Sequence, residues 1–370
     1  KNDNFTIEVQ ASILKQMKIL HFKYRALGPC ETFIERQLRL FRNSRKLKAE
    51  FLFIRNNPVQ LSCPISYRSG WLEFLRLFLV SRKHLPNIIH AHFGSNALLA
   101  MSLTLFRKLP LIVSFYGHDV GAFPRKNLGF NLMLYYLLFK HCHTVVAMTE
   151  PMRTQLIELG CPPFKIKKYY IGVDPLKPRQ RKSSELKNLL MVSSLRPKKN
   201  HALVLRSLAY LRDQDINLNL RIIGDGPHRN YLEKLICDLN LADQVGFMGH
   251  IADREKLAQH YQWADLMLHP SCIDRSGDQE GLPSSIVEAF STGIAVILSN
   301  HVGLRDVFSA VGLYTDPHDD QELAALIGNL YSSPALLKDL EKQSSQIYAR
   351  SFADKEYFEP LKKLYVQALV

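Results

Sequence analysis

The feature that most constrains the fold is an alternation, repeated twice, between short apolar runs and longer segments of mixed polarity. The first series of runs covers residues 17–23, 49–54, 87–92, 109–115 and 143–148. The second covers residues 188–193, 218–223, 244–249, 265–271 and 295–299. Apolar runs separated by helix-length segments are typical of parallel sheets covered on both faces. The sequence therefore predicts an α/β protein with two doubly wound, Rossmann-like domains.

A polar, basic stretch with prolines separates the two series. We expect an N-terminal domain over 1–172, a linker over 173–187, a C-terminal domain over 188–345, and a helix in 346–370 that returns toward the first domain. Ligands of such sheets bind beyond the carboxyl ends of the strands, which predicts a site in the cleft between the domains. Residues 1–16 do not resemble a signal peptide, and we expect Met17 to be the natural start.

Composition excludes several classes of protein. With 46% hydrophobic and 22% charged residues, the chain is neither collagen-like nor disordered. The apolar stretch Trp71–Val80 is too short to span a bilayer. The six cysteines form no C-x-x-C pair and no His/Cys cluster, which predicts a reducing compartment and no structural zinc. Asp213 and Asp215 form a D-x-D in a polar turn, which we interpret as solvated and not as a metal site.

The excess of positive charge lies entirely in the first half of the chain. Residues 1–172 contain 25 Lys and Arg against 9 Asp and Glu, whereas residues 173–370 contain 23 against 25. This asymmetry indicates an anionic partner, such as a membrane leaflet, a phosphorylated lipid or nucleic acid, or else a solvated basic surface. No nucleic-acid-binding module is recognisable, so we expect no nucleic-acid partner.

The strongest local signal is the segment from Glu280 to Glu288, EGLPSSIVE. Pro283 suits the first turn of a helix and Gly293 suits its end. The helix should therefore begin just after Glu280 and leave the backbone N–H groups of about Leu282 to Ile286 free. Such a helix N-terminus is a ready site for a diphosphate.

These residues resemble the signature of glycosyltransferase family 4. The segments IGVD (171–174), GDGP (224–227), FMGHI (247–251), WADLMLHPS (263–271) and AFSTGIAVILSNHVG (289–303) match the family in the same order. In the first half, GPCETFIERQ (28–37), IIHAHFG (88–94) and SFYGHDV (114–120) are similar to a subgroup active in exopolysaccharide and lipopolysaccharide assembly. The resemblance implies a GT-B fold, two Rossmann-like domains facing each other across a cleft.

The resemblance also implies roles for individual residues. Glu288 would bind the ribose hydroxyls of the nucleotide, Glu280 would contact donor-sugar hydroxyls, and Lys199 would grip the diphosphate. The remaining donor-side residues are Gly281, Leu282 and Pro283 beside the sugar, Ser284, Ser285 and Ile286 at the phosphates, Gly249, His250 and Ile251 at the base, and Gly224 in a turn at the cleft.

Three departures from the family pattern stand out. Ser193-Ser194 replaces the usual Gly-Arg ahead of the lysine, so Arg196 is expected to reach the phosphates instead, with Lys198 a weaker candidate. The usual His-Gly after the fourth strand is Tyr116-Gly117, which moves the expected donor-contacting histidine to His118, beside Asp119. The glycine-rich loop after the first strand is reduced to Gly28.

On the acceptor side we place Gly28, His92, Tyr116, Arg125 and Lys126. Two alternatives remain open there. His90 and His92 lie on a strand and are either buried or part of the site. The apolar segment Phe123–Phe139 is either a buried helix or a surface that faces acceptor or membrane.

The resemblance implies a retaining, metal-independent glycosyltransferase with no cofactor. It would transfer a sugar from a nucleotide diphosphate, expected to be UDP, to a glycan or polyprenyl-diphosphate-linked acceptor in cell-surface polysaccharide synthesis. The expected location is cytoplasmic, on the inner face of the membrane. The altered Ser194 and Tyr116 keep one alternative open, a non-catalytic GT-B scaffold that binds nucleotide sugar or lipid.

Overall fold

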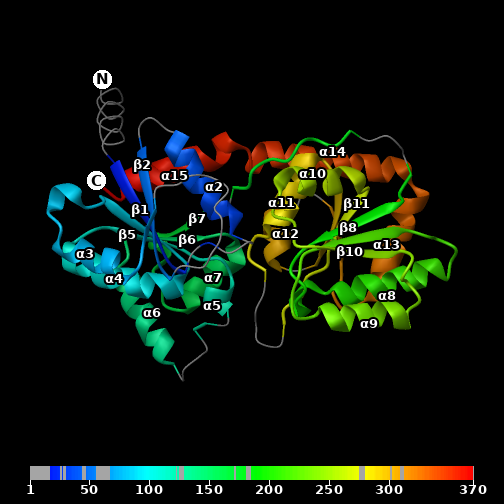
Figure 1. Cartoon of the computed structure of the whole chain (residues 1–370), viewed down its shortest axis with the longest axis horizontal. Helices are drawn as coiled ribbons and strands as arrows, with labels where there is room; N and C mark the ends of the chain where they lie inside the picture. Colours follow the sequence, from blue (N-terminus) through cyan, green and yellow to red (C-terminus); the bar gives the residue numbers. More distant parts are fainter. Residues whose placement is uncertain are drawn as a thin grey trace. The chain divides into compact units, whose positions relative to one another are not determined.

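The computed structural model describes residues 17–25, 27, 31–43, 47–55, 67–121, 123–124, 129–170, 172–180, 185–274, 280–300, 302–308 and 312–369. The chain divides into two compact units. The first combines residues 1–172 with 354–370, and the second is residues 173–353. Each unit contains one parallel sheet (Figure 1).

The sheet of the first unit has seven strands in the order β3-β2-β1-β4-β5-β6-β7. The strands are β1 (Met17–Arg25), β2 (Leu47–Arg55), β3 (Tyr67–Ser69), β4 (Ile88–His92), β5 (Leu111–Ser114), β6 (Thr144–Ala147) and β7 (Ile166–Lys168). Chain order reverses between β1 and β4, where His21 lies opposite His90. Such a reversal is where ligands of doubly wound sheets bind.

Helices of the first unit form two groups on its sheet. The helices are α2 (Thr32–Asn43), α3 (Trp71–Leu79), α4 (Gly94–Arg107), α5 (His118–Gly121), α6 (Phe130–His141), α7 (Glu150–Glu158) and α15 (Asp354–Gln367). Connections β1–β2 and β4–β5 cross the sheet in opposite directions, so right-handed crossovers place α2 and α4 on opposite faces. The ring of Phe41 contacts Phe358 and Tyr365, which packs α15 beside α2.

The sheet of the second unit has six strands in the order β10-β9-β8-β11-β12-β13. They are β8 (Asn188–Val192), β9 (Asn219–Ile223), β10 (Val245–Gly249), β11 (Leu266–His269), β12 (Ala295–Ser299) and β13 (Leu313–Thr315). In order along the chain this is 3-2-1-4-5-6, the arrangement of dinucleotide-binding Rossmann domains. The predicted α/β fold class is confirmed.

Seven helices accompany this sheet in the described part of the second unit. They are α8 (His201–Arg212), α9 (Arg229–Asp238), α10 (Arg254–Trp263), α11 (Ser284–Thr292), α12 (Val302–Phe308), α13 (Asp320–Ser332) and α14 (Pro334–Ser351). Leu189, Leu205 and Leu268 belong to the core between strands and helices. None of the helices in the described part of the chain combines the length and hydrophobicity of a bilayer-spanning segment.

The expected linker is in part packed against the second unit. Val173 and Leu176 are buried, and Arg179 forms ion pairs with Asp265 and Glu341. Residues 173–180 therefore belong to the second unit, because buried apolar contacts and a paired arginine hold them there. The C-terminal segment is also divided, since α14 ends at Ser351 in the second unit and α15 belongs to the first.

Candidate active site

Three loops at the carboxyl ends of β8, β9 and β10 are joined by backbone hydrogen bonds. The N–H of Gly224 donates to the carbonyl of Gly249 (2.8 Å), and the N–H of Leu195 donates to the carbonyl of Asp225 (3.0 Å). Gly224 has φ 136°, and a Cβ there would lie 2.0 Å from the carbonyl oxygen of Ser193. Only glycine fits this position, so the sequence GDG holds the loops together.

An ion pair occupies the point where strand order reverses in the second sheet. Lys199 ends the 3₁₀ turn Pro197–Lys199 after β8, and Glu280 lies in the loop after β11. The Lys199 ammonium is 2.7 Å from the Glu280 carboxylate, and Lys198 is 3.9 Å away. Burial raises the pKa of Glu280, but the two lysines outweigh it and lower the pKa to about 2. Glu280 is therefore ionised at neutral pH.

The N-terminus of α11 begins close to this pair in the sequence. The helix starts at Ser284, so Pro283 is the N-cap and not, as predicted, a residue of the first turn. The N–H of Ile286 donates to the Pro283 carbonyl (3.2 Å), which removes Ile286 from the expected set of free donors. Within the described residues, the N–H groups of Ser284 and Ser285 have no acceptor. These two groups can hydrogen-bond an anion.

Glu288, two turns into α11, is buried and paired. Its carboxylate accepts a hydrogen bond from Arg254 (2.6 Å) and one from the Tyr261 hydroxyl (3.2 Å). Burial raises the pKa of Glu288, and Arg254 opposes this rise. Arg254 also donates to the carbonyl of Asp174 (2.6 Å) and keeps 32% of its side chain exposed. Sequence reasoning missed Arg254 because nothing in the order of residues links it to Glu288.

Other predicted donor-side residues lie on the loops of the same edge. Arg196 is exposed, and its guanidinium has no partner among the residues described. His250 is exposed and follows Gly249, whose φ is 67°. Ser194 and Ile251 are half-buried, while Gly281 and Leu282 are buried.

His269, at the end of β11, is a further site residue that the sequence did not identify. It is buried, and its Nε2 has no hydrogen-bond partner in the described part of the chain. Burial and Lys199 lower its pKa to about 3, although Glu280 opposes them, so the imidazole is neutral.

In the first unit, His118 and Asp119 have different environments. His118 is exposed at the start of α5. Asp119 is buried, and its carboxylate accepts hydrogen bonds from the N–H groups of Gly94 (2.9 Å), Tyr116 (2.9 Å) and Gly117 (3.0 Å). The prediction of a catalytic Asp119 is corrected here: it fixes the loop that carries His118 and faces no open space.

Three buried histidines meet where strand order reverses in the first sheet. His21 Nδ1 is 2.9 Å from His92 Nε2, and His90 contacts Tyr365 (2.5 Å) and Ser114 (2.8 Å). His21, His90 and His92 are close enough together to be considered as a metal-ligand set. However, both nitrogens of His90 and of His92 are already hydrogen-bonded, which favours a structural network.

This network corrects the acceptor-side assignment of His92. Its side chain is fully buried, and its Nδ1 is 2.7 Å from the hydroxyl of Tyr116. Half-buried Tyr116 therefore separates His92 from the surface. A second feature of this edge, missed in the sequence, is the ion pair of Lys23 with Glu31 at 2.6 Å. Gly28, Arg125 and Lys126 lie outside the described residues.

Buried histidines should make stability fall in mild acid. Burial lowers the pKa of His90 to about 3, and the pKa values of His21 and His92 are also well below 6.5. Below pH 6.5 the unfolded chain binds more protons than the folded one, so the free energy of unfolding decreases as pH falls toward 3, by up to about 1.4 kcal/mol per pH unit for each histidine. Urea unfolding between pH 7 and 5 should show this slope, and His90→Gln should flatten it. An unchanged slope in that variant would contradict the burial argument.

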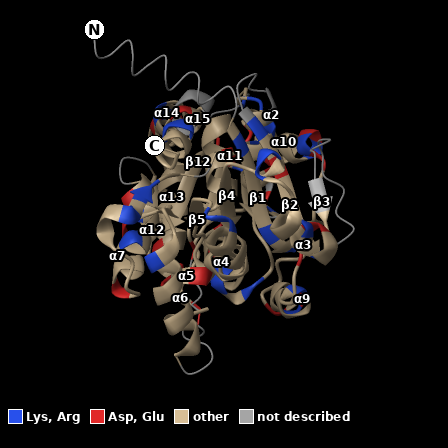
Figure 2. Cartoon of the chain, turned by 90° about the vertical axis from the view of Figure 1, so that its left-hand side faces the viewer, with Lys and Arg blue, Asp and Glu red and all other residues tan. Residues whose placement is uncertain are grey.

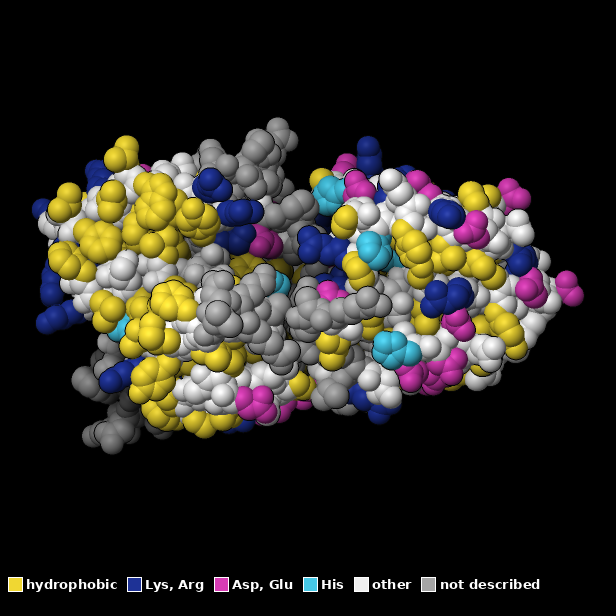
Figure 3. Space-filling model, turned by 90° about the horizontal axis from the view of Figure 1, so that it is seen from below, with side chains coloured by type: hydrophobic (Ala, Val, Ile, Leu, Met, Phe, Trp, Pro, Cys, Tyr) yellow, Lys and Arg dark blue, Asp and Glu magenta, His cyan; other side chains and the backbone are white. Residues whose placement is uncertain are grey.

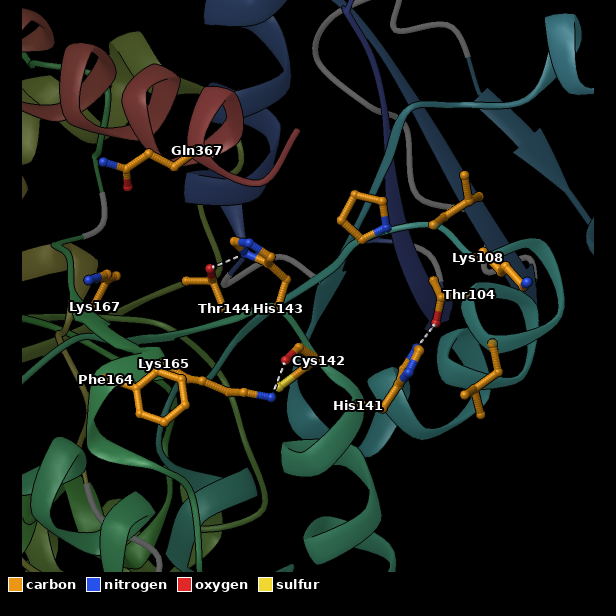
Figure 4. A pocket seen from close by; sticks show the side chains of 13 residues that line it. Thr104, Lys108, His141, Cys142, His143, Thr144, Phe164, Lys165, Lys167 and Gln367 are labelled. Carbon is orange, nitrogen blue, oxygen red and sulfur yellow. Dashed lines mark hydrogen bonds between the residues drawn. The ribbon is translucent and has the colours of Figure 1, made fainter. Parts of the chain in front are cut away.

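An open pocket of about 790 Å³ lies at the opposite edge of the first sheet (Figure 4). Its lining includes Pro110, His143 and Lys165, which precede β5, β6 and β7. Lys165 donates to the carbonyls of Phe139, Lys140 and Cys142, so its charge is used to end α6. This pocket is at the amino ends of the strands and is separate from the residues described above.

Two protein families match the chain, one in each half. Residues 38–176 match Glycosyltransferase Family 4, and residues 173–347 match Glycosyl transferases group 1. The putative colanic acid biosynthesis glycosyltransferase WcaL of Salmonella typhimurium is 28% identical over 66% of this chain and 62% of its own length. The amylovoran biosynthesis glycosyltransferase AmsK of Erwinia amylovora is 28% identical over 67% and 62%. The chain thus spans about 62% of the length of these relatives.

Among solved structures, the Anabaena protein HepE in complex with UDP has a similar fold. The TM-score is 0.79, with 18% sequence identity, over 95% of this chain and 100% of HepE. At this identity the likeness concerns the fold alone. The two family matches follow each other along the chain and each falls largely in one Rossmann-like unit, so the first unit is similar to family 4 domains and the second to group 1 domains of glycosyltransferases with the GT-B fold.

Proposed function

We propose that this protein is a retaining glycosyltransferase that transfers a sugar from a nucleotide diphosphate in the synthesis of a cell-surface polysaccharide. The observation that carries the proposal is the Lys199–Glu280 pair at the reversal point of the second sheet, in the same stretch of chain as the unpaired N–H groups of Ser284 and Ser285. A cation and helix N–H groups match the charge of a diphosphate. The names of WcaL and AmsK support the polysaccharide context.

The donor is bound by the second unit. Lys199 and the α11 N-terminus hold the diphosphate, and Glu288 accepts hydrogen bonds from ribose. We propose UDP as the nucleotide, supported by the complexes of HepE with UDP and UDP-glucose. Glu280, kept ionised by Lys199, accepts hydrogen bonds from donor-sugar hydroxyls and positions the sugar, and His118 supplies a further contact.

The proposed reaction retains the anomeric configuration. The acceptor hydroxyl attacks the anomeric carbon on the face from which the diphosphate leaves, and the departing phosphate oxygen takes the hydroxyl proton. The bond from carbon to phosphate oxygen breaks as the glycosidic bond forms. No protein nucleophile and no metal enters this course, because Lys199 and the helix N-terminus neutralise the leaving group.

The acceptor is bound by the first unit. Its excess of positive charge, with 25 Lys and Arg against 9 Asp and Glu in residues 1–172, supports an acceptor carried on a polyprenyl diphosphate at an anionic membrane surface. The protein would then work on the inner face of the cytoplasmic membrane.

Nucleotide binding and transfer test the proposal together. UDP should raise the melting temperature, since a ligand at a hundredfold excess over Kd stabilises the folded state by about 2.7 kcal/mol, and GDP should raise it less. Incubation with UDP-sugars and a lipid-linked acceptor should give an α-linked product from an α-linked donor, seen by NMR. Stabilisation by UDP without transfer or donor hydrolysis would favour the alternative, a non-catalytic scaffold. Absence of stabilisation by any nucleotide would reject both.

A further inference from the structure

Exposed large hydrophobic side chains gather on three helices of the first unit. Of the described residues of this kind, eleven lie on α3, α4 and α6, namely Trp71, Leu72, Leu75, Leu79, Leu105, Phe106, Phe130, Leu132, Met133, Tyr136 and Leu137. In the second unit the described ones are scattered over separate elements: Tyr210, Tyr231, Met248, Ile273 and Tyr331. Figure 3 shows hydrophobic side chains over this part of the first unit. An apolar surface formed by this many side chains on neighbouring helices marks an interaction site.

The three helices form one continuous surface, here called the α3–α4–α6 face. The rings of Phe78 and Phe106 are 5.4 Å apart, and Arg107 of α4 donates to the carbonyl of Phe78 (3.1 Å). At the other side of α4, a Cβ on Gly94 would lie 2.5 Å from the Tyr135 hydroxyl of α6, so glycine allows close packing. The three helices are therefore packed against one another, and their exposed side chains keep fixed positions relative to each other.

α3 shows that the outward side chains are not a by-product of core packing. Its inward residues Phe74 and Leu77 are almost completely buried. Its opposite side carries Leu72 and Leu79, which are 83% and 86% exposed. Apart from Glu73 and Arg76, α3 is apolar on both sides, and apolar helix surface is expected inside a protein or in contact with lipid. Here one side has the protein core and the other has no cover among the described residues.

The charges around this face are almost all positive. Among the described residues between 70 and 149 there are six Lys and Arg but only Glu73 and Asp119 as acids. Asp119 is buried, and Glu73 is paired with Arg76 at 3.5 Å. Helices α4 and α6 contain no acidic residue (Figure 2). Exposed cations at this face are Arg76, Arg82, Lys83, Lys108 and Lys140.

We propose that the α3–α4–α6 face docks on an anionic lipid bilayer, with its apolar side chains in the interface and its cations at the headgroups. This proposal rests on the proposed function in one respect, that the acceptor is linked to a lipid. An apolar helix surface bordered by Lys and Arg is the composition of interfacial membrane segments. A second copy of the chain fits less well, because a symmetric contact would bring like charges together.

The α3–α4–α6 face is one of two basic sides of the first unit. The positive charge of residues 1–172 also includes the stretch of residues 39–46, and Arg125 and Lys126, predicted on the acceptor side, lie outside the described residues. α2, which carries Arg39, packs beside α15 on the other face of the sheet. The α3–α4–α6 face therefore presents a different side of the first unit to the lipid.

The sequence supplies its own reporter of insertion. Trp71, at the start of α3, is 49% exposed, and the chain has only one other tryptophan, Trp263. In the variant Trp263→Phe, Trp71 is the sole tryptophan. The guanidinium of Arg221, which lies over the Trp263 ring, can still stack on the phenylalanine ring. Its emission should shift to the blue with vesicles of phosphatidylcholine and phosphatidylglycerol, and lipids brominated near the headgroup should quench it. An emission spectrum that does not change while the protein sediments with these vesicles would overturn the proposal.

A pair of matched variants tests the same face by sedimentation. Leu72→Glu/Leu79→Glu should weaken binding to anionic vesicles by about tenfold or more, because both apolar contacts are lost and two negative charges are added. Tyr210→Glu/Tyr331→Glu adds the same charge to exposed positions of the second unit and should bind normally. Equal binding by both variants would overturn the proposal. So would a dimer in solution that the leucine variant dissociates.

UDP binding separates this proposal from the proposed function. Both variants should bind UDP with the affinity of the unmodified protein in calorimetry, because Leu72 and Leu79 belong to the first unit, and Tyr210 and Tyr331 lie on α8 and α13 and not on the loops that carry Lys199 and Glu280. Normal vesicle binding with no UDP binding would leave the docking face intact and reject the donor site. Normal UDP binding without vesicle binding would reject the docking face alone.

Discussion

Lys199→Ala is expected to lower the rate of sugar transfer about 10²–10³-fold, the loss that follows removal of one preorganised group facing developing charge. In the structure Lys199 is held by Glu280 at 2.7 Å, so its ammonium is positioned before the donor binds. The effect should fall on kcat, because the diphosphate gains negative charge as the bond to the sugar breaks. Single-turnover rates with saturating donor measure it directly.

Two control variants separate catalysis from folding. Lys199→Ala leaves the Glu280 carboxylate, whose side chain is only 8% exposed, without its nearest cation, which also destabilises the second unit. The double variant Lys199→Ala/Glu280→Gln should recover stability, and its transfer should remain below that of Glu280→Gln alone, which lacks only the sugar-positioning carboxylate. Lys198→Ala, whose ammonium is 3.9 Å from Glu280, should lose less activity. Recovery of transfer in the double variant would mean that Lys199 serves stability alone.

Arg196→Ala addresses the departure from the family pattern at Ser194. The guanidinium of Arg196 is exposed, with no partner in the described part of the chain, so it is available for the donor phosphates. If it replaces the missing family arginine, transfer should fall with stability unchanged. A near-normal rate would show that Lys199 and the N-terminus of α11 neutralise the charge of the diphosphate without Arg196.

Glu288→Ala is expected to weaken UDP binding about 10- to 150-fold, because each charge-assisted hydrogen bond to the ribose contributes about 1.5–3 kcal/mol. Calorimetry measures this affinity, and Glu280→Gln, which should chiefly lower turnover, is the comparison. Unchanged UDP affinity in Glu288→Ala would remove Glu288 from the nucleotide site.

Arg254 gives this prediction a pH dependence. Burial raises the pKa of Glu288 and Arg254 opposes the rise, so Arg254→Met should raise this pKa further. UDP affinity of the variant should then decrease as pH falls, because a protonated carboxyl accepts fewer hydrogen bonds, and Arg254→Lys should recover part of it. Arg229→Met, which removes a half-buried arginine paired with Glu233, is the matched control. Equal pH profiles in Arg254→Met and Arg229→Met would contradict a role for Arg254.

The central strands and the five-residue edge strand β10 could be predicted from the sequence, but the three-residue edge strands could not. β4, β8 and β12 agree with the apolar runs because strands covered on both faces are mostly apolar. β7 has three residues of which only the first is buried, so it has no such run. β3 and β13 also have three residues. Short strands at the edge of a sheet depend on their neighbour more than on their own composition.

The candidate site shows the same division between local and distant information. The start of α11 was predicted to within a few residues from its proline and glycine, which act locally. The Arg254–Glu288 pair joins residues 34 apart in sequence, and the histidine network joins His21 to His92 across 71. Asp119 was assigned to catalysis because its neighbour is His118, whereas the fold turns its carboxylate toward backbone N–H groups. Pairings of this kind follow from strand order and not from motif spacing.

The return of α15 to the first unit has a consequence for biosynthesis. Tyr365 accepts a hydrogen bond from Gln37 (3.0 Å) and contacts His90, so the last helix completes a network that begins with the first strands. On the ribosome, the second unit can finish folding while this helix is still in the exit tunnel, whereas the first unit cannot. A nascent first unit therefore waits for some 180 further residues with Tyr365 absent, so its histidine network stays incomplete for longer during translation than any part of the second unit.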